Sequence, residues 1–228
     1  MKIIHHASGS SGNAIQVDDI LIDSGVKTDG EYELLLITHA HIDHIRHITH
    51  SLGSSRHFYA PPMVLQSIYD KTAKWAEKKK ITLYGQIIDK RIDEEQLKEY
   101  DIEWFDLTHD VPCVGYRIKD YVHISDTGSF EIPAFIRNQR FYTIESNYDE
   151  TELEMSGRPL ELIERIKDTH LSNEQSIELA MELNAKEVMF VHLSDETNSH
   201  DLASITHAIE APQIKKHYPK GREEYDIR

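Results

Sequence analysis

The chain has 228 residues, and 25 basic against 40 acidic side chains give it a formal net charge of −15. Such an acidic surface repels nucleic-acid backbones, so a polyanionic substrate has to be drawn in by local basic patches or by bound metal ions. A hydrophobic content of 39% without low-complexity tracts indicates one compact globular domain over residues 1–228.

The first half of the sequence predicts short strands separated by polar loops. A loop of small residues, 7–13, follows the first strand, and Asp18 and Asp19 mark the turn of a hairpin. In chain order we expect strands at 2–5, 14–17, 20–22, 34–38 and 58–60, then a helix that Pro61 and Pro62 open, that continues through Trp75 and that ends in the solvated run Lys78–Lys80.

The second half begins with more strands and then changes to helices alternating with one strand. We expect strands at 102–107, 114–118, 121–124, 141–144 and 188–191, a helix at 160–166, and a helix from the capping box Ser172–Gln175 through Leu183. The charged tail, 215–228, is predicted to be loop-like and partly mobile. Strands in both halves with helices outside them predict an α/β fold of two sheets packed face to face.

The cysteine content and the lack of long apolar segments indicate in which cellular compartment to expect the protein. Cys113 is the single cysteine, which excludes an intramolecular disulfide and is compatible with a reducing compartment. Neither a signal peptide nor an apolar stretch of membrane-spanning length is evident. We therefore expect a cytoplasmic protein without a membrane partner.

The segment Thr38–His44 carries the main chemical signal of the sequence. It reads Thr-His-Ala-His-Ile-Asp-His and directly follows the apolar run 34–37. His39 and His41 are spaced to bind one metal ion, while Asp43 and His44 turn toward a second. The pattern predicts a dinuclear metal site, because a dry core does not accept so many unpaired titratable groups.

Two metal ions need further donors from distant segments. Three other predicted strands are followed by a candidate ligand, namely His109, Asp126 and His192. An aspartate such as Asp126 is suited to bridging two cations, since each of its oxygens binds one of them. An isolated histidine after a strand is commonly a surface residue, so it is the joint occurrence that favours a site.

The chain resembles the metallo-β-lactamase fold, and within it the WalJ/YycJ-type, exonuclease-like phosphodiesterases. The resemblance is carried by Asp23, the His-x-His-x-Asp-His segment and the three later donors, together with the motifs at 7–13, 108–116, 145–147, 170–174 and 192–194. It implies a four-layer αββα sandwich of two mixed sheets with helices outside. It further implies that His39, His41 and His109 bind the first ion, that Asp43, His44 and His192 bind the second, and that Asp126 bridges them.

The resemblance also implies the remaining roles. Asp23 would orient a ligand imidazole, although a turn-forming aspartate fits the same sequence. The cofactors would be two divalent ions per chain, Zn or Mn, which activate a shared water as hydroxide for attack on phosphorus while Asp43 accepts a proton. His170 would protonate the leaving oxygen with Glu145 keeping it charged, unless His170 is only a structural residue before a helix cap.

The expected activity is hydrolysis of a phosphodiester. The substrate is a nucleic-acid end or, as the alternative, a small cyclic nucleotide of the kind cleaved by phage anti-Pycsar phosphodiesterases; a non-catalytic metal-binding module is the other class, and a homodimer stays open. Substrate contacts are expected from Ser10, Asn13, Asn147 and Ser172, although a tight strand connection would use the same small residues at 7–13. Histidines elsewhere, including His207, have no predicted role.

Overall fold

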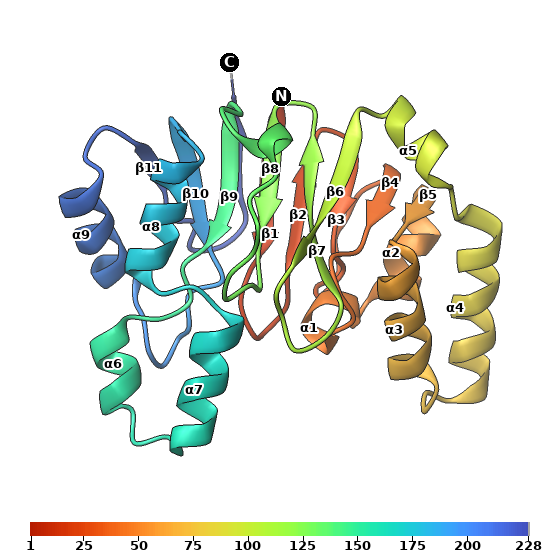
Figure 1. Cartoon of the computed structure of the whole chain (residues 1–228). Coiled ribbons are helices and arrows are strands. Elements are labelled where there is room, and N and C mark those ends of the chain that lie inside the picture. Colours follow the sequence, from red (N-terminus) through yellow and green to blue (C-terminus); the bar gives the residue numbers. More distant parts are fainter. Residues whose placement is uncertain (228) are drawn as a thin grey trace. The chain divides into compact units, whose positions relative to one another are not determined.

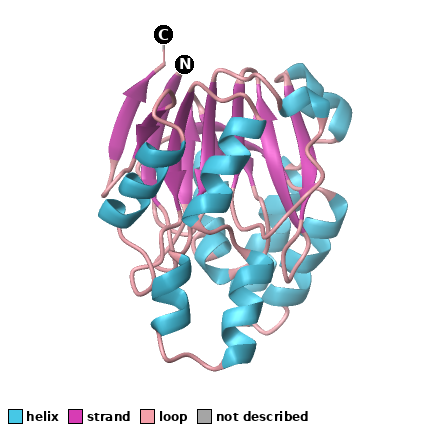
Figure 2. Ribbon diagram, turned by 60° about the vertical axis from the view of Figure 1, so that its left-hand side comes forward, coloured by secondary structure: helices cyan, strands magenta, loops and turns pink. Residues whose placement is uncertain are grey.

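The computed structural model describes residues 1–227, which form two compact units (Figure 1). The first unit consists of Met1–Asp101 with the C-terminal segment from Lys220, and the second unit is Ile102–Pro219. Helices and strands occur in both units, which confirms the α/β class (Figure 2). Each unit contains one mixed six-stranded sheet, so the prediction of two mixed sheets is also confirmed.

The first sheet has the strand order β12-β1-β2-β3-β4-β5. The predicted hairpin is confirmed, because β2 and β3 pair in antiparallel register around Asp18 and Asp19. Strand β4 pairs in parallel with β3 and with β5, and Leu34, Leu35 and Leu36 are fully buried in it. The strand bounds are β1 Lys2–Ala7, β2 Ala14–Val17, β3 Ile20–Ile22, β4 Tyr32–Leu36, β5 Ser55–Tyr59 and β12 Glu223–Asp226.

The helices of the first unit correct one prediction. The helix opened by Pro61 and Pro62 ends at Thr72, and Lys78–Lys80 do not follow it but form the first turns of a separate helix, α4. The lysines hide this start, since the apolar residues that anchor α4, Leu83 and Ile87, come later and are fully buried. The bounds are α1 Ile42–Ile45, α2 Ile48–Ser54, α3 Pro62–Thr72, α4 Glu77–Lys90 and α5 Glu94–Glu99.

The second sheet has the order β11-β10-β9-β8-β7-β6. Strands β8, β9, β10 and β11 run parallel to one another, whereas β6, β7 and β8 form an antiparallel meander. Strands β6, β8, β9 and β10 therefore end at the same edge of the sheet. The bounds are β6 Ile102–Leu107, β7 Cys113–Ile118, β8 Tyr121–Ile124, β9 Phe141–Glu145, β10 Glu187–Val191 and β11 Lys215–His217.

Helix α8 covers the core of the second unit. Its capping box is present as predicted: Ser172 accepts a hydrogen bond from the backbone N–H of Gln175, whose side chain bonds back to the N-cap backbone. Ile177 and Leu183 pack into one cluster with residues of the sheet such as Phe190. The helices are η1 Ala134–Ile136, α6 Glu150–Met155, α7 Leu160–Thr169, α8 Asn173–Glu182 and α9 His200–Glu210.

The C-terminal tail is not a loop. Lys215–His217 forms β11 beside β10, and Glu223–Asp226 forms β12, which pairs with β1 from Lys2 to His5. The prediction missed both strands because their side chains are polar and largely exposed, so they lack the alternating apolar pattern that marks a strand. Within residues 1–227 no helix has the length and apolar character needed to cross a bilayer.

Candidate metal centre

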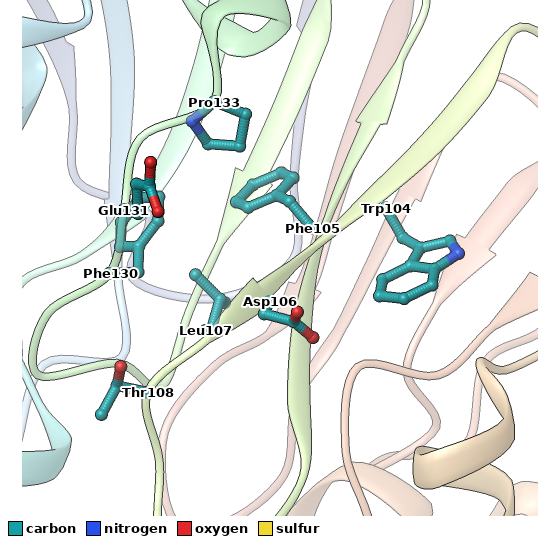
Figure 3. Close-up of a pocket in the computed structure, with 8 residues that line it drawn as sticks. All are labelled: Trp104, Phe105, Asp106, Leu107, Thr108, Phe130, Glu131 and Pro133. Carbon is teal, nitrogen blue, oxygen red and sulfur yellow. The ribbon is translucent and has the colours of Figure 1, made fainter.

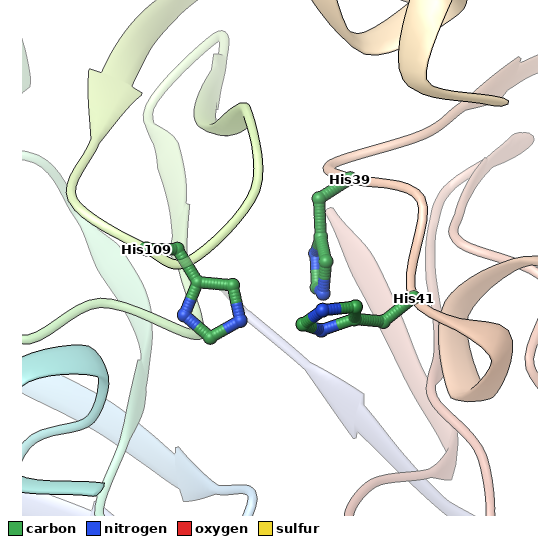
Figure 4. A group of neighbouring side chains, drawn as sticks. All are labelled: His39, His41 and His109. Atoms are coloured by element: carbon green, nitrogen blue, oxygen red, sulfur yellow. The ribbon is translucent and has the colours of Figure 1, made fainter. Parts of the chain in front are cut away.

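In the first unit, the His-x-His-x-Asp-His segment leaves the end of β4 and turns into the short helix α1. His41 is the N-cap residue of α1 but does not cap it with its side chain, and Asp43 and His44 lie within the helix. The ring centroid of His39 lies 4.8 Å from that of His41 and 4.0 Å from that of His44. Figure 4 shows His39 and His41 turned toward each other. Three imidazoles of this segment therefore gather at one strand end.

The carboxylate of Asp23 determines which nitrogen of two histidines carries the proton. Asp23 Oδ2 accepts hydrogen bonds from His44 Nδ1 at 2.7 Å and from the hydroxyl of Thr38 at 2.9 Å. Because the Thr38 hydroxyl donates to Asp23, it accepts from His39 Nδ1, which lies 3.0 Å away. Both imidazoles thus keep the proton on Nδ1, so that Nε2 is the basic nitrogen through which histidine binds metals; in His44 this nitrogen lies 2.8 Å from the amide of Asn13.

Two residues of the first unit hold the histidine segment against the strands. The amide of Asn13 contacts Asp43 Oδ2 at 3.1 Å and His44 Nε2 at 2.8 Å, and its backbone N–H donates to the carbonyl of Asp43 at 2.7 Å. A Cβ atom on Gly25 would lie 1.6 Å from that same carbonyl oxygen. Only glycine at position 25 permits this close approach.

In the second unit, four side chains that can bind a metal ion gather at one edge of the sheet. Asp126, Glu145, His170 and His192 each offer a ligand atom, and these atoms all lie within 4.8 Å of one another. His192 Nε2 lies 3.5 Å from Asp126 Oδ1, and both side chains are buried. The parallel strands β8, β9 and β10 supply three of the four, which is the arrangement expected when polar residues follow parallel strands.

His109 follows β6 at the same edge and is oriented by the end of helix α7. Its Nδ1 lies 3.1 Å from the carbonyl oxygen of Thr169, so Nδ1–H donates and Nε2 is the basic nitrogen. A Cβ on Gly128 would lie 1.9 Å from the carbonyl oxygen of Asp168, so glycine lets the loop after Asp126 approach the same helix end. Figure 4 shows His109 on the loop that leaves β6.

His170 and Glu145 form a hydrogen-bonded pair beside the donors. His170 Nδ1 lies 2.9 Å from Glu145 Oε2, and Glu145 Oε1 accepts the backbone N–H of Thr127 at 2.6 Å. Burial by itself raises the pKa of Glu145, but the positive charge and hydrogen bond of His170, with a further bond from His192, lower it below its ordinary value. Glu145 is therefore a buried carboxylate that accepts a hydrogen bond from His170 Nδ1.

Three of the site residues adopt a left-handed backbone conformation. The φ angles are 63° at Asp23, 61° at Asp126 and 58° at His192. Asp23 and His192 directly follow a strand and Asp126 follows one after a single residue, and this conformation turns the chain sharply so that the side chain leaves the line of the strand. Non-glycine residues hold it at a cost of about 1 kcal/mol, and they concentrate at functional sites.

The four predicted substrate contacts differ in placement. Ser10 is exposed in its loop, whereas Asn13 is buried against the histidine segment. Ser172 is buried as the N-cap of α8, and the amide of Asn147 donates to the carbonyl of His192 at 3.0 Å. These placements favour a positioning role for Asn13, Asn147 and Ser172 over substrate contact.

A buried polar network that the sequence did not predict lies behind Glu145 and Asn147. His207 Nε2 lies 3.0 Å from Ser176 Oγ and 3.3 Å from Ser146 Oγ, and Ser146 Oγ donates to Asn173 Oδ1 at 2.7 Å. Asn198 bonds to the carbonyl of Ser146 at 2.8 Å. Since Ser146 stands between Glu145 and Asn147, this network fixes the backbone that carries both.

The donor set fits divalent metal ions. Imidazoles in the Nδ1–H form together with buried carboxylates match the N/O coordination of Zn²⁺ and Mn²⁺ alike. Orienting hydrogen bonds from Asp23, Thr38 and Thr169 supply the outer contacts that metal-binding histidines need.

The sequence was compared with models of known protein families. The sequence matches the family model described as a beta-lactamase superfamily domain over residues 25–193, a match that runs through both units. No curated protein matches the sequence.

Solved structures share the fold at low sequence identity. The metallo-beta-lactamase fold protein YhfI from Bacillus subtilis aligns with a TM-score of 0.65 at 15% identity, covering 99% of this chain and 100% of that one. The short form of human tRNase Z gives 0.64 at 12%, covering 100% of both chains. A diphosphatase of the PhnP family gives 0.60 at 16%, covering 100% of this chain and 98% of that one.

Proposed function

Since the chain belongs to the beta-lactamase superfamily, we propose that it is a metal-dependent phosphodiesterase that binds two divalent ions. His39, His41 and His109 would hold one ion and Asp43, His44 and His192 the other, with Asp126 bridging. The Nδ1–H tautomers of His39, His44 and His109 support metal binding by these histidines through Nε2. The ions would activate water and offset the charge that develops on the phosphoryl oxygens.

The protein's own residues supply the proton transfers. Asp43 is partly exposed and stands beside His44, with Asp43 Oδ2 3.7 Å from His44 Nε2, so it is positioned to accept a proton from the attacking water. His170, bonded to Glu145 through Nδ1, directs the opposite edge of its ring toward a departing alkoxide and protonates it. Its side chain is partly exposed, which gives a substrate access to it.

The pair of His170 and Glu145 is the observation that carries the proposal. A module that only binds metal needs no imidazole hydrogen-bonded to a fully buried carboxylate, and His170 Nδ1 lies 3.9 Å from Asp126 Oδ1 within the donor cluster. A proton donor at this position serves an ester whose leaving group is an alkoxide. The PhnP-family diphosphatase and tRNase Z, which share the fold, are both named for phosphate chemistry.

We place a nucleic-acid end first among substrates and a small cyclic nucleotide second. The sequence motifs resemble exonuclease-like relatives, which favours the former. The formal charge of −15 favours the latter, because a small ligand needs no extended basic surface.

The test is hydrolysis by the metal-loaded protein. Labelled single-stranded DNA and RNA, cyclic mononucleotides and the generic diester bis(4-nitrophenyl) phosphate are compared, with Zn²⁺ and Mn²⁺ loaded separately. His170→Ala should lower turnover by about 10²- to 10⁴-fold at unchanged metal content. His200→Ala is the matched control, since His200 lies on α9 and its Nε2 contacts the carbonyl of Pro219. Absence of hydrolysis with every diester, or full activity of His170→Ala, would contradict the proposal.

A further inference from the structure

A patch of basic side chains lies beside the histidine segment in the first unit. It is formed by Lys27 from the loop after β3, by Arg46, His47 and His50 at the junction of α1 and α2, and by Lys79 from the first turn of α4. We call these five residues the basic patch. Figure 1 shows α1 and the turn between α3 and α4 at the same, lower end of this unit. Segments distant in the sequence thus bring cations together in a chain of formal net charge −15.

The charges of the patch converge on His47. The pKa of His47 is lowered from its ordinary value, first by burial and then by four neighbouring positive charges, those of Lys27, Arg46, His50 and Lys79. All four charges have the same sign, so their effects add. The local potential is therefore positive although the chain as a whole is acidic.

The longer cations of the patch are exposed and not neutralised. Lys27, Arg46 and Lys79 are exposed, and within residues 1–227 no carboxylate forms an ion pair with any of them. Arg46 donates one N–H to the carbonyl of Ser11 at 2.6 Å, which leaves its other N–H groups for a ligand. Lys79 Nζ lies 3.5 Å from the ring centroid of Trp75, a contact that holds the charge without cancelling it. An anion can therefore bind here without first breaking an ion pair.

The turn that presents Lys79 is fixed by contacts between α3 and α4. The rings of Tyr69 and Tyr84 meet edge to face with centroids 4.9 Å apart, and the hydroxyl of Tyr84 donates to the carbonyl of Tyr69 at 3.3 Å. The backbone N–H of Trp75 donates to the carbonyl of Thr72 at 2.9 Å. A surface that is formed before binding loses less conformational entropy than a mobile arm does.

The patch begins where the candidate metal ligands of the first unit end. Arg46 follows His44 by two residues. Because consecutive Cα atoms are about 3.8 Å apart, the Cα atoms of these two residues lie within about 8 Å of each other. A chain of phosphates that reaches His44 can therefore continue to Arg46, whereas a cyclic mononucleotide has no second phosphate to place there.

A pocket of about 430 Å³ beside β6, in the second unit, offers no such surface. Figure 3 shows the carboxylates of Asp106 and Glu131 among its lining residues. The lining contains no lysine, arginine or histidine, so a phosphate chain is repelled from it. This contrast favours the basic patch as the place where a polyanion binds.

We propose that the basic patch binds the phosphate backbone of a single-stranded nucleic acid next to the nucleotide that is cleaved. The proposal rests on the function proposed above and names its substrate more closely, as a strand rather than a cyclic mononucleotide. Lys27, Arg46 and Lys79 neutralise phosphates and release their counterions, so binding does not depend on the base sequence. A duplex carries charge more densely on two strands and would need a longer basic surface than this patch provides.

The test measures binding of strands of different length to the full-length protein loaded with Zn²⁺. A labelled single strand of about 12 nucleotides and a labelled dinucleotide, both with phosphorothioate linkages that resist hydrolysis, are followed by fluorescence anisotropy at about 50–200 mM NaCl. We expect the longer strand to bind at least tenfold more tightly, and its affinity to fall as the salt concentration rises.

Substitutions locate the binding surface. Lys27→Gln combined with Lys79→Gln removes two phosphate contacts, so the slope of log K against log[salt] should become shallower by about 1.4 and the affinity should fall about tenfold. Lys186→Gln combined with Lys220→Gln is the matched control, because both lysines are exposed outside the patch and the same charge is removed. Trp104→Phe leaves Trp75 beside Lys79 as the sole indole, so its emission should change when the strand binds.

The outcomes separate this proposal from its alternatives. Equal effects of the two double variants, or equal affinity for the long strand and the dinucleotide, would overturn it. Vesicles of phosphatidylserine and phosphatidylcholine are tested in parallel, and binding of vesicles without binding of strands would identify a membrane surface as the partner and also overturn it. Strand binding at the patch without hydrolysis of any diester would refute the proposed function alone. Hydrolysis of strands with a KM that Lys27→Gln combined with Lys79→Gln leaves unchanged would refute the patch alone.

Discussion

Protonation of His207 should limit the stability of the protein at acidic pH. The imidazole is fully buried, packs on Phe190 with ring centroids 3.9 Å apart and contacts the hydroxyl of Tyr218 through Nδ1 at 2.9 Å. Desolvation by burial lowers the pKa of His207 from 6.5 to about 4, although a hydrogen bond with the carbonyl of Asn173 opposes the shift. In the folded protein His207 is thus neutral at pH values at which the unfolded chain already binds a proton.

The sign and size of the effect follow from this difference. Between pH 6.5 and pH 4 the unfolded state holds more protons at position 207 than the folded state, so the free energy of unfolding falls as the pH is lowered. The full shift corresponds to about 3 kcal/mol, of which about 2 kcal/mol is lost between pH 7 and pH 4.5. Below pH 4 both states are protonated and the contribution changes no further.

The assay is urea unfolding followed by tryptophan fluorescence at pH 7 and at pH 4.5. His207→Gln should lose about 2 kcal/mol less than the wild type between these pH values, because it removes the titrating group. Tyr218→Phe keeps the buried imidazole and serves as the control, which should retain the wild-type pH dependence even if it is less stable throughout. If His207→Gln and the wild type lose equal stability between pH 7 and pH 4.5, the assignment of a neutral, buried His207 is wrong.

Three further changes test the site. Asp23→Asn removes the carboxylate that bonds His44 and Thr38, and it should weaken metal binding 10- to 100-fold in a chelator competition while the exposed Asp19→Asn does not. Gly25→Ala places a Cβ 1.6 Å from the carbonyl of Asp43, so it should prevent a stable fold or displace the His-x-His-x-Asp-His segment. Gly85→Ala is the control in helix α4, where a Cβ would have nothing within 4 Å. It should raise the free energy of unfolding by about 0.5–1 kcal/mol, as measured by thermal unfolding. Glu145→Gln turns an amide N–H toward His170 Nδ1 if its oxygen keeps the bond to Thr127, so turnover should fall at unchanged metal content, and full turnover would contradict the role of Glu145.

The parts of the fold that the sequence predicted are those fixed by neighbours along the chain. The β2–β3 hairpin follows from two apolar runs around Asp18 and Asp19, and the start of α8 follows from the capping box at Ser172. Both signals act over four residues or fewer, so an isolated segment contains them completely. The strand before the histidine segment was likewise evident from its uninterrupted apolar residues.

The parts that were missed depend on partners far away in the sequence. Strand β12 exists because Glu223–Asp226 pairs with β1, more than 200 residues earlier, and its own exposed side chains carry no strand pattern. Helix α4 was missed because Lys78–Lys80 resemble the solvated end of a helix, while the residues that bury it come one and two turns later. In both cases tertiary contacts override the local preference.

In the candidate site, too, the local sequence predicts some features and contacts between distant segments determine the others. His39, Asp126 and His192 stand shortly after apolar runs, which made them visible in the sequence. A sequence position does not determine which ring nitrogen of a histidine is basic. That choice comes from Asp23, Thr38 and the carbonyl of Thr169, two of which are ordinary loop or helix-end groups. The left-handed backbone conformation at Asp126 and His192 is likewise not predictable from the sequence, because neither residue type requires it and only the surrounding fold maintains it. Residue identity therefore limits what chemistry is possible, and contacts between distant segments decide whether the donors are oriented to perform it.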